Sequence, residues 1–243
     1  MILYNFADFK IHFKNKYTEF RYLCENYITE DESEKPLILS ITENDIEYEK
    51  ERSEYEYGNS YLETLSAYRK LSEWLPLHNA FLLHSAVVDV DGVGVAFAAH
   101  SGTGKTTHML LWQKLFGERM TVVNGDKPII RFFDDEPNTP YAYGTPWCGK
   151  ENLGCNMRTP LKHICFIERC ETNSVERVDK ADAIDRIFNQ VYMPKDGMAL
   201  MNTMSLIDRL LSCCTLWKIK CNMEDDAAKV AYEILGVTAP NNE

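Results

Sequence analysis

The segment at residues 99–107, AHSGTGKTT, constrains the fold of this 243-residue chain more than any other. It follows a strand-like run at 93–97 and precedes a helical pattern at 106–116, which ends at Gly117. The segment matches G-x-x-x-x-G-K-[ST] except that Ala99 replaces the first glycine. A glycine-rich turn between a strand and a helix exposes backbone N–H groups that hold phosphate oxygens. The sequence therefore predicts a phosphate-binding loop within an α/β core.

Each part of this loop has a predicted role in binding ATP and Mg²⁺. The glycines allow backbone conformations that other residues avoid, together with a close approach to the ligand. Lys105 is expected to reach the β- and γ-phosphates, and the Thr106 hydroxyl is expected to ligate Mg²⁺. The predicted nucleotide-binding residues are Ser101, Gly102, Thr103, Gly104, Lys105, Thr106 and Thr107.

A second metal ligand is needed, and Asp126 is the candidate. It stands in NGDKP, directly after the short apolar strand expected at 121–124. A carboxylate just beyond a strand end, beside a phosphate loop, is where NTPases hold Mg²⁺. The alternative is that these residues only form a turn, because Asn, Gly, Asp and Pro are all turn formers.

The remaining pattern divides the chain at about residue 78. Residues 1–78 are expected to form a small N-terminal α+β subdomain or lid, and residues 79–243 the nucleotide-binding domain. In the first part we expect strands near 9–13 and 36–42, an exposed acidic stretch at 43–61, and a helix over 62–75. In the second part, Asp91-Gly92 predicts a hairpin between strands 82–90 and 93–97. Further strands are expected at 121–124, 129–133, 163–167 and 216–220, and helices at 181–191, 198–213 and 225–235.

Charge and composition exclude several classes of function. The chain has 37 acidic against 26 basic residues, a formal net charge of -11, whereas nucleic acids and anionic membranes require a basic surface. It has no apolar run of the roughly 18 residues that a membrane span needs, and its first residues lack the pattern of a signal peptide. We therefore expect no nucleic-acid or membrane partner, a cytoplasmic location, and eight reduced cysteines.

Three motifs in order resemble the shared core of phosphoenolpyruvate carboxykinase and HPr kinase/phosphorylase. They are Leu83-His-Ser-Ala86 before a hairpin, then SGTGKTT, then NGD. The stretch that begins at Tyr143, YGTPWCGKENLG, is similar to small HPr-kinase-like proteins of peptide-maturation cassettes. The resemblance implies a P-loop core of mixed sheet flanked by helices. It also implies ATP- and Mg²⁺-dependent phosphoryl transfer to a hydroxyl, with Lys105, Asp126 and His84 as catalytic residues. The carboxykinase reaction itself is not expected, because those enzymes are much longer.

One departure from the family leaves two interpretations open. HPr kinase/phosphorylase has a pair of aspartates where this chain has Gly125 and Asp126. Either Asp126 both holds metal and acts as base, with His84 as the next candidate for base or second metal contact, or transfer is lost. In the second case the protein is a nucleotide-binding accessory protein of a peptide-modification pathway. The acceptor also stays open between a peptide or protein serine and a small molecule, as does the choice between ATP and GTP.

The loop at 143–156 is rich in Gly, Pro, Trp and Asn, which is typical of a functional loop. We expect it to lie near the acceptor, with Trp147 either a substrate platform or a packed aromatic residue. Lys150, Asn156 and Arg158 are candidate substrate contacts, although either cation could equally be a surface residue. Related HPr kinases form multimers, but no interface is evident in this sequence, so the choice between a monomer and a homo-oligomer stays open.

Overall fold

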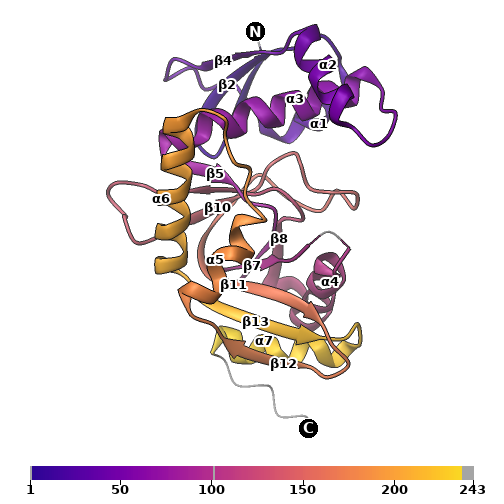
Figure 1. Ribbon diagram of the computed structural model, residues 1–243, viewed down its shortest axis with the longest axis vertical. Helices are drawn as coiled ribbons and strands as arrows, with labels where there is room; N and C mark the ends of the chain where they lie inside the picture. Colours follow the sequence, from indigo (N-terminus) through magenta and orange to yellow (C-terminus); the bar gives the residue numbers. More distant parts are fainter. Residues whose placement is uncertain (1, 101, 237–243) are drawn as a thin grey trace.

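The computed structural model describes residues 2–100 and 102–236, and Figure 1 shows how the chain runs through them. The first part of the chain forms a four-stranded sheet in the order β3-β1-β2-β4, with three helices beside it. The β2–β4 pair is parallel, and the other pairs of this sheet are antiparallel. The elements are β1 (Leu3–Phe6), β2 (Phe9–Lys14), α1 (Glu19–Leu23), β3 (Ile28–Thr29), β4 (Leu37–Ser40), α2 (Glu43–Arg52) and α3 (Asn59–Trp74).

A second, nine-stranded sheet forms the larger part of the molecule. Its strands follow the order β5-β9-β10-β11-β7-β6-β8, and β13 joins β11 and carries β12. Strand β11 is parallel to β7 and β13, while the remaining pairs are antiparallel, so the sheet is mixed. The strands are β5 (Ala80–Leu82), β6 (Ala86–Val90), β7 (Val93–Ala98), β8 (Met120–Asn124), β9 (Ile129–Arg131), β10 (Tyr141–Tyr143), β11 (Arg158–Arg169), β12 (Ser174–Arg177) and β13 (Thr215–Cys221).

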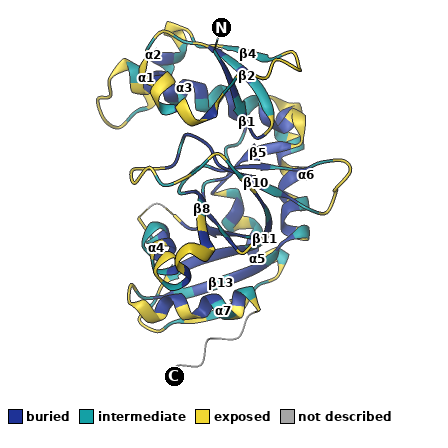
Figure 2. Ribbon diagram, turned by 180° about the vertical axis from the view of Figure 1, so that it is seen from behind, coloured by how far each residue is buried: buried dark blue, intermediate teal, exposed yellow. Residues whose placement is uncertain are grey.

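Helices cover both faces of this sheet, because its strands alternate their side chains between two apolar clusters. On β7, Phe97 packs with Trp112 of α4, at 4.9 Å between ring centroids, whereas Ala96 belongs to the cluster that holds Ile187 and Leu206. Figure 2 shows these strands as buried ribbon between the helices. The chain is thus a mixed α/β protein with mixed sheets flanked by helices. Its later helices are α4 (Lys105–Phe116), α5 (Lys180–Phe188), α6 (Gly197–Cys213) and α7 (Val230–Leu235).

A third apolar cluster joins the two sheets. Phe6, Phe20 and Leu71 from the first part pack with Ile129 and Tyr143 of the second sheet, and all are buried. The first sheet uses residues up to 40 and the second begins at 80, and the division at 78 stays a prediction. The shared cluster means that the N-terminal elements are packed directly against strands β5, β9 and β10 of the second sheet.

The hairpin at Asp91-Gly92 is confirmed, and the single strand expected over 82–90 is wrong in part. Both turn residues have positive φ, as the tight turn between β6 and β7 requires. Residues 83–85 leave the sheet between β5 and β6, because their N–H groups bond to loops instead. One such bond joins the His84 N–H to the Gln190 carbonyl at 2.7 Å.

The acidic stretch at 43–61 is not simply an exposed surface, as the sequence suggested. Its first part is the helix α2, which starts at a capping box between Thr42 and Asp45. Asp45 and Glu49 point toward α3, where the Arg69 guanidinium lies 3.1 and 2.5 Å from them. Ile46 is buried beneath this ion-pair cluster. The charges therefore tie α2 to α3, while the residues beyond α2 are exposed.

The expected helices at 181–191 and 198–213 correspond to α5 and α6. The final one is shorter than predicted, because residues 225–229 form a 3-10 turn before α7. Short strands β1, β3, β10 and β12 have no counterpart among the predictions, since each has four residues or fewer.

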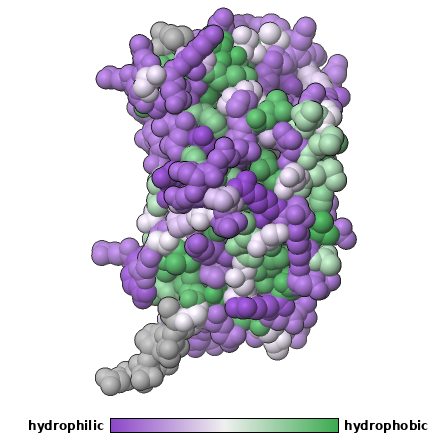
Figure 3. Space-filling view, turned by 90° about the vertical axis from the view of Figure 1, so that its left-hand side faces the viewer, coloured by the Kyte–Doolittle hydropathy of each residue, from purple (hydrophilic) through white to green (hydrophobic). Residues whose placement is uncertain are grey.

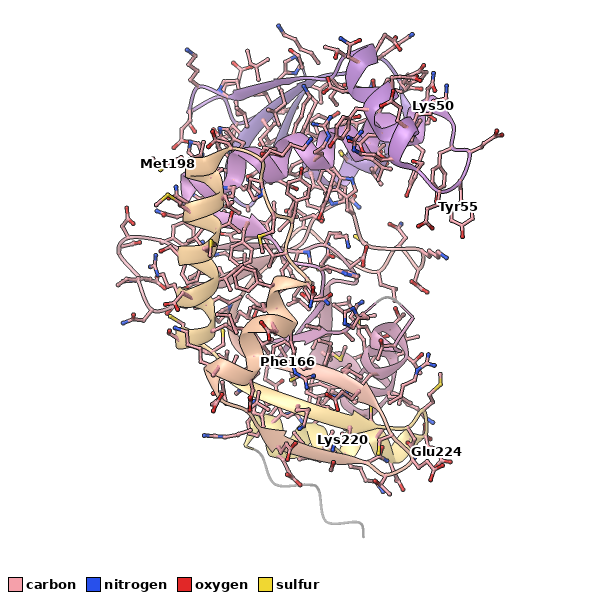
Figure 4. The ribbon with its side chains drawn as sticks, in the orientation of Figure 1. Lys50, Tyr55, Phe166, Met198, Lys220 and Glu224 are labelled. Carbon is pink, nitrogen blue, oxygen red and sulfur yellow. The ribbon has the colours of Figure 1, made fainter. Side chains whose placement is uncertain are left out.

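The outer surface combines polar groups with separate apolar ones. Figure 3 shows one side face, on which hydrophilic residues predominate around apolar patches. On α6, Met198, Met201 and Met204 are exposed, and Figure 4 shows Met198 at the start of this helix, far from Lys220 on β13. Among the described residues, no helix combines the length and apolar character that crossing a bilayer requires.

The buried His108 is expected to make stability depend on pH. Burial lowers its pKa from 6.5 to about 4, and its Nε2 accepts a hydrogen bond from Trp112 Nε1 at 3.0 Å. The unfolded chain therefore binds a proton that the folded chain excludes, so stability falls as pH drops from 6.5 to 4. The loss is at most about 3 kcal/mol. Urea unfolding of wild type and His108→Gln across this range measures it. Equal pH slopes in both proteins would rule out His108 as the source.

Candidate active site

The loop between β7 and α4 has two glycines in backbone conformations that other residues rarely adopt. Gly102 and Gly104 have φ values of +77° and +113°, and an added Cβ at either would meet no other atom within 4 Å. Glycine is thus required for its backbone conformation rather than for space. The α4 helix begins at Lys105, directly after the loop, so its N-terminus lies at the loop. Ser101, one of the predicted binding residues, lies outside the described residues.

Arg169 at the end of β11 holds this loop by two hydrogen bonds. Its Nε donates to the Thr103 carbonyl at 3.0 Å, and its Nη2 donates to the Gly102 carbonyl. The carbonyl groups of Thr103 and Gly102 are thereby engaged by the Arg169 guanidinium. Loop amides remain the groups suited to an anion, since a carbonyl repels one.

Lys105 is buried and its ammonium makes few contacts. Its Nζ donates to the Ala99 carbonyl at 3.0 Å and lies 3.1 Å from His84 Nε2. Burial lowers its pKa, opposed by the charge of Asp126 and assisted by Lys127. An ammonium with one neutral acceptor in a cavity has spare donors for an anionic ligand.

Asp126 is held in place by an Asn turn at the end of β8. The buried Asn124 accepts from the backbone N–H groups of Asp126 and Lys127 at 2.8 and 2.7 Å through its Oδ1. Its Nδ2 donates to the Thr145 carbonyl at 3.0 Å. This explains the N-G-D pattern locally, because the Asn side chain replaces the backbone partners lost where the strand ends.

The Asp126 carboxylate is charged in the folded protein. Burial by itself would raise its pKa, but the hydrogen bond from His84 and the charges of Lys127 and Lys105 bring the pKa below its usual value. The measured contacts are 3.1 Å from Asp126 Oδ1 to His84 Nε2 and 3.6 Å from its Oδ2 to Lys127 Nζ. The result is an ionised carboxylate with two cations and an imidazole around it.

Gln190 determines which nitrogen of His84 carries the proton. In the amide orientation that satisfies its hydrogen bonds, Gln190 donates to His84 Nδ1 and to the Ala99 carbonyl, both at 3.1 Å. Because Nδ1 accepts, the proton of the neutral ring lies on Nε2, which donates to Asp126. Nε2 then has no lone pair for Lys105, so their 3.1 Å contact is not a hydrogen bond. His84 is therefore a donor that orients Asp126.

A cavity of about 460 Å³ connects these groups. Most predicted site residues line it, and Thr103 lines a neighbouring cavity of about 310 Å³ on the Arg169 side. The 460 Å³ cavity is lined by eight of the residues predicted from the sequence: His84, Gly102, Gly104, Lys105, Thr106, Thr107, Asp126 and Lys150.

The donor set of this cavity fits Mg²⁺ bound with phosphates. Thr106 offers a hydroxyl and Asp126 an ionised carboxylate, and Mg²⁺ prefers oxygen ligands, usually one or two from protein with the rest from water and phosphate. Within the described residues there is no cluster of three or more His, Cys, Asp or Glu side chains that could hold a metal alone. The protein groups thus suit a metal that arrives with a nucleotide.

The three remaining candidates fall in different places. Trp147 lines a separate cavity of about 770 Å³ that shares Asp126 and Lys150 with the first. Asn156 donates to the Asn26 carbonyl at 2.9 Å and lines none of these cavities. Arg158, on β11, lies 3.4 Å from Asp8 and donates to the Tyr143 hydroxyl at 3.0 Å. The structure thus brings Lys150 and Trp147 to Asp126 and places Asn156 and Arg158 against the N-terminal elements.

Three groups at the site were missed by sequence reasoning. Lys127 directly follows Asp126, so its charge beside a candidate ligand was a usable signal. Gln190 and Arg169 carried no such signal. They are distant in sequence and reach the loop only because the strands and α5 bring them there.

Gly125 is explained by the loop packed over it. An added Cβ would lie 2.7 Å from the Cys148 carbonyl oxygen and 3.1 Å from that of Leu153. A second aspartate at this position would therefore collide with backbone. The glycine is a packing requirement of this chain, and its presence is not by itself a sign of lost chemistry.

Gly125→Ala is accordingly expected to destabilise the protein. Forcing a methyl group against two backbone carbonyls costs about 1–3 kcal/mol of unfolding free energy. Gly197→Ala is the matched control, because an added Cβ there meets nothing within 4 Å and its φ is not left-handed. Urea unfolding of both variants measures the difference. A Gly125→Ala protein as stable as the control would disprove the steric explanation.

Comparison with known proteins gives one distant structural match to report. No protein-family model matches the chain, and no curated protein matches it. Among solved structures, the HPr(Ser) kinase/phosphatase from Coxiella burnetii aligns with a TM-score of 0.37 and 8% identity. The alignment covers 64% of this chain and 94% of that one. At this TM-score the match does not bear on chemistry, which depends on the residues described above.

Proposed function

We propose that this protein transfers the γ-phosphoryl group of ATP to a hydroxyl, with Mg²⁺ as cofactor. The observation that carries the proposal is a juxtaposition in one cavity. Lys105, the glycine-rich loop and the Asp126 carboxylate line the same cavity, and His84 Nε2 lies 3.1 Å from both Lys105 Nζ and Asp126 Oδ1. This is the set of groups that phosphoryl transfer uses, namely a phosphate-binding loop, a cation and a carboxylate.

The loop and Lys105 would hold the phosphates. Loop N–H groups and the α4 N-terminus favour anionic oxygens. Lys105 needs to give up only one carbonyl partner to reach them. Thr106 and Asp126 would hold Mg²⁺, which supplies charge neutralisation between the phosphate oxygens. Fixed positive groups of this kind provide most of the catalysis in phosphoryl transfer.

Asp126 is the group that would orient or deprotonate the acceptor hydroxyl. His84 is unsuited to that role, because Gln190 occupies its Nδ1 and its Nε2 carries the proton. A carboxylate with a lowered pKa is a weak base, which suits a transition state with little bond formation to the acceptor. Asp126 therefore combines the two roles that the carboxylate pair divides in the family this sequence resembles.

The fate of labelled γ-phosphate tests the proposal. Full-length protein is incubated with [γ-³²P]ATP and Mg²⁺, with and without a pool of hydroxyl compounds, and the products are separated. Label on an organic acceptor is the expected result. Label in inorganic phosphate alone would instead indicate an ATPase, and ATP that binds without turnover would favour the non-catalytic accessory protein.

A further inference from the structure

We propose that the cavity of about 770 Å³ beside Asp126 is the acceptor site, and that the acceptor is a small alcohol or phenol with a flat apolar body. This inference rests on the proposed function. It adds the class of molecule that receives the phosphoryl group, and it assigns recognition of that molecule to the aromatic lining of Tyr68 and Trp147.

The position of the cavity points to the acceptor. It is enclosed between α1 and α3 of the N-terminal part and the loop at 146–152, and it meets the phosphate-side cavity at Asp126, Gly149 and Lys150. Asp126 thus faces both cavities. A hydroxyl in the 770 Å³ cavity would reach the carboxylate from the space next to the predicted phosphates, and transfer requires such neighbouring sites.

The walls of the cavity are apolar and aromatic. Tyr68 and Trp147 lie edge to face, with ring centroids 5.5 Å apart, and Leu23 and Leu65 line the same space. Trp147 is supported from behind by Phe6, at 5.8 Å between centroids. A ring fixed in this way offers a flat surface with little freedom to lose, and aromatic ligands gain from stacking on it.

Several polar groups lie close to the Asp126 carboxylate. Burial raises the pKa of Tyr68 and of Tyr61, and the charge of Asp126 raises both further, so both hydroxyls stay protonated near the carboxylate. Lys127 also lines the cavity, 3.6 Å from Asp126. The cavity therefore has polar groups beside Asp126 for a hydroxyl and an apolar body for the remainder of the ligand.

The size of the cavity favours a small molecule over a protein surface. Sites that enclose most of a small organic ligand have volumes of about 300–1,000 Å³. Glycerol or free serine would leave the aromatic wall uncovered. A compound such as 2-naphthol fills the apolar part with its rings and places one hydroxyl beside Asp126.

The first measurement is binding, which needs no transfer. Full-length protein without nucleotide is titrated with 2-naphthol, glycerol and the peptide Gly-Ser-Gly, and ligand NMR saturation transfer reports contact. We expect binding of 2-naphthol only. Trp147→Ala should weaken it roughly tenfold by loss of stacking and apolar contact, whereas Trp147→Phe should retain most of it. Equal binding of 2-naphthol by wild type and Trp147→Ala would overturn the proposal.

Ser60→Trp tests the site without removing a packed ring. Ser60 lines the cavity near the start of α3, so a large side chain there narrows it and should weaken 2-naphthol binding at least tenfold. Thermal melting of each variant confirms that it is folded. Undiminished binding by a folded Ser60→Trp protein would place the ligand elsewhere.

The second measurement is transfer from [γ-³²P]ATP to the same three compounds. We expect label on 2-naphthol, with a KM for it that rises more than kcat falls in Trp147→Ala. Transfer to glycerol or Gly-Ser-Gly in preference to 2-naphthol would disprove the acceptor class while leaving the phosphotransferase intact. Binding of 2-naphthol with no transfer to any compound would mean that the cavity is not an acceptor site and that the proposed function has failed.

Discussion

Lys105→Ala is expected to abolish stabilisation of the protein by ATP and Mg²⁺. Wild type with ATP at 100 times its Kd should gain about 2.7 kcal/mol of unfolding free energy. The variant loses the buried ammonium that faces the cavity, so this gain should disappear, and transfer should fall by about 10²- to 10³-fold or more. Thermal melting with ATP, GTP and ADP, each with and without Mg²⁺, measures the first effect and the base preference.

The matched control is Lys114→Ala, on the same helix. Lys114 is exposed and pairs with Asp225, away from the cavity, so its removal should leave the nucleotide-dependent shift unchanged. A full ATP shift in Lys105→Ala would show that the loop is not the phosphate site. No shift in wild type with any nucleotide would remove the basis of the proposed function.

Asp126→Asn should remove the Mg²⁺ dependence of ATP binding and lower transfer by about 10⁴-fold or more. The amide keeps the size of the side chain but loses the charge that Mg²⁺ ligation needs, and removing one electrostatic contact of this kind costs 10²- to 10³-fold. General-base help is worth a further factor of about 10² or more if Asp126 also activates the hydroxyl. The melting shift with ATP, compared with and without Mg²⁺, and the transfer rate report the two roles separately.

Glu151→Gln is the control for charge, because Glu151 lines the same cavity and has no assigned role. It should retain Mg²⁺-dependent ATP binding. An Asp126→Asn protein that still requires Mg²⁺ would move the metal site to another residue, and Glu151 would then be the first to examine.

Local sequence was enough to predict the elements that carry the loop. The β7 strand, the left-handed glycines, the α4 helix (one residue longer than the predicted 106–116) and the hairpin at Asp91-Gly92 all follow from patterns within a few residues. A turn at 124–128 was the alternative interpretation of the sequence, and the Asn124 side chain does accept from backbone N–H groups two and three residues on. These features depend on short-range sterics and hydrogen bonds, which a sequence displays directly.

The grouping of side chains around Asp126 required the tertiary structure. His84 reaches the site because the chain breaks between β5 and β6, where its backbone bonds to Gln190 instead of to a strand. The sequence showed a strand-like run over 82–90 interrupted only by His84, Ser85 and Asp89, and nothing nearby identifies a partner more than 100 residues later. The end of a strand therefore depends on long-range packing, because the backbone N–H groups there bond to a segment that the fold places beside them.

The sequence by itself determined the glycine-rich loop between a strand and a helix, the candidate carboxylate and the mixed α/β class, because each follows from adjacent residues. Tertiary structure alone decided the contact of His84 with Gln190, the need for glycine at 125, and the aromatic cavity beside Asp126. That cavity has walls from α3 and from the loop at 146–152, which are about 80 residues apart in the chain. The cavity forms because the third apolar cluster packs the N-terminal elements against the second sheet.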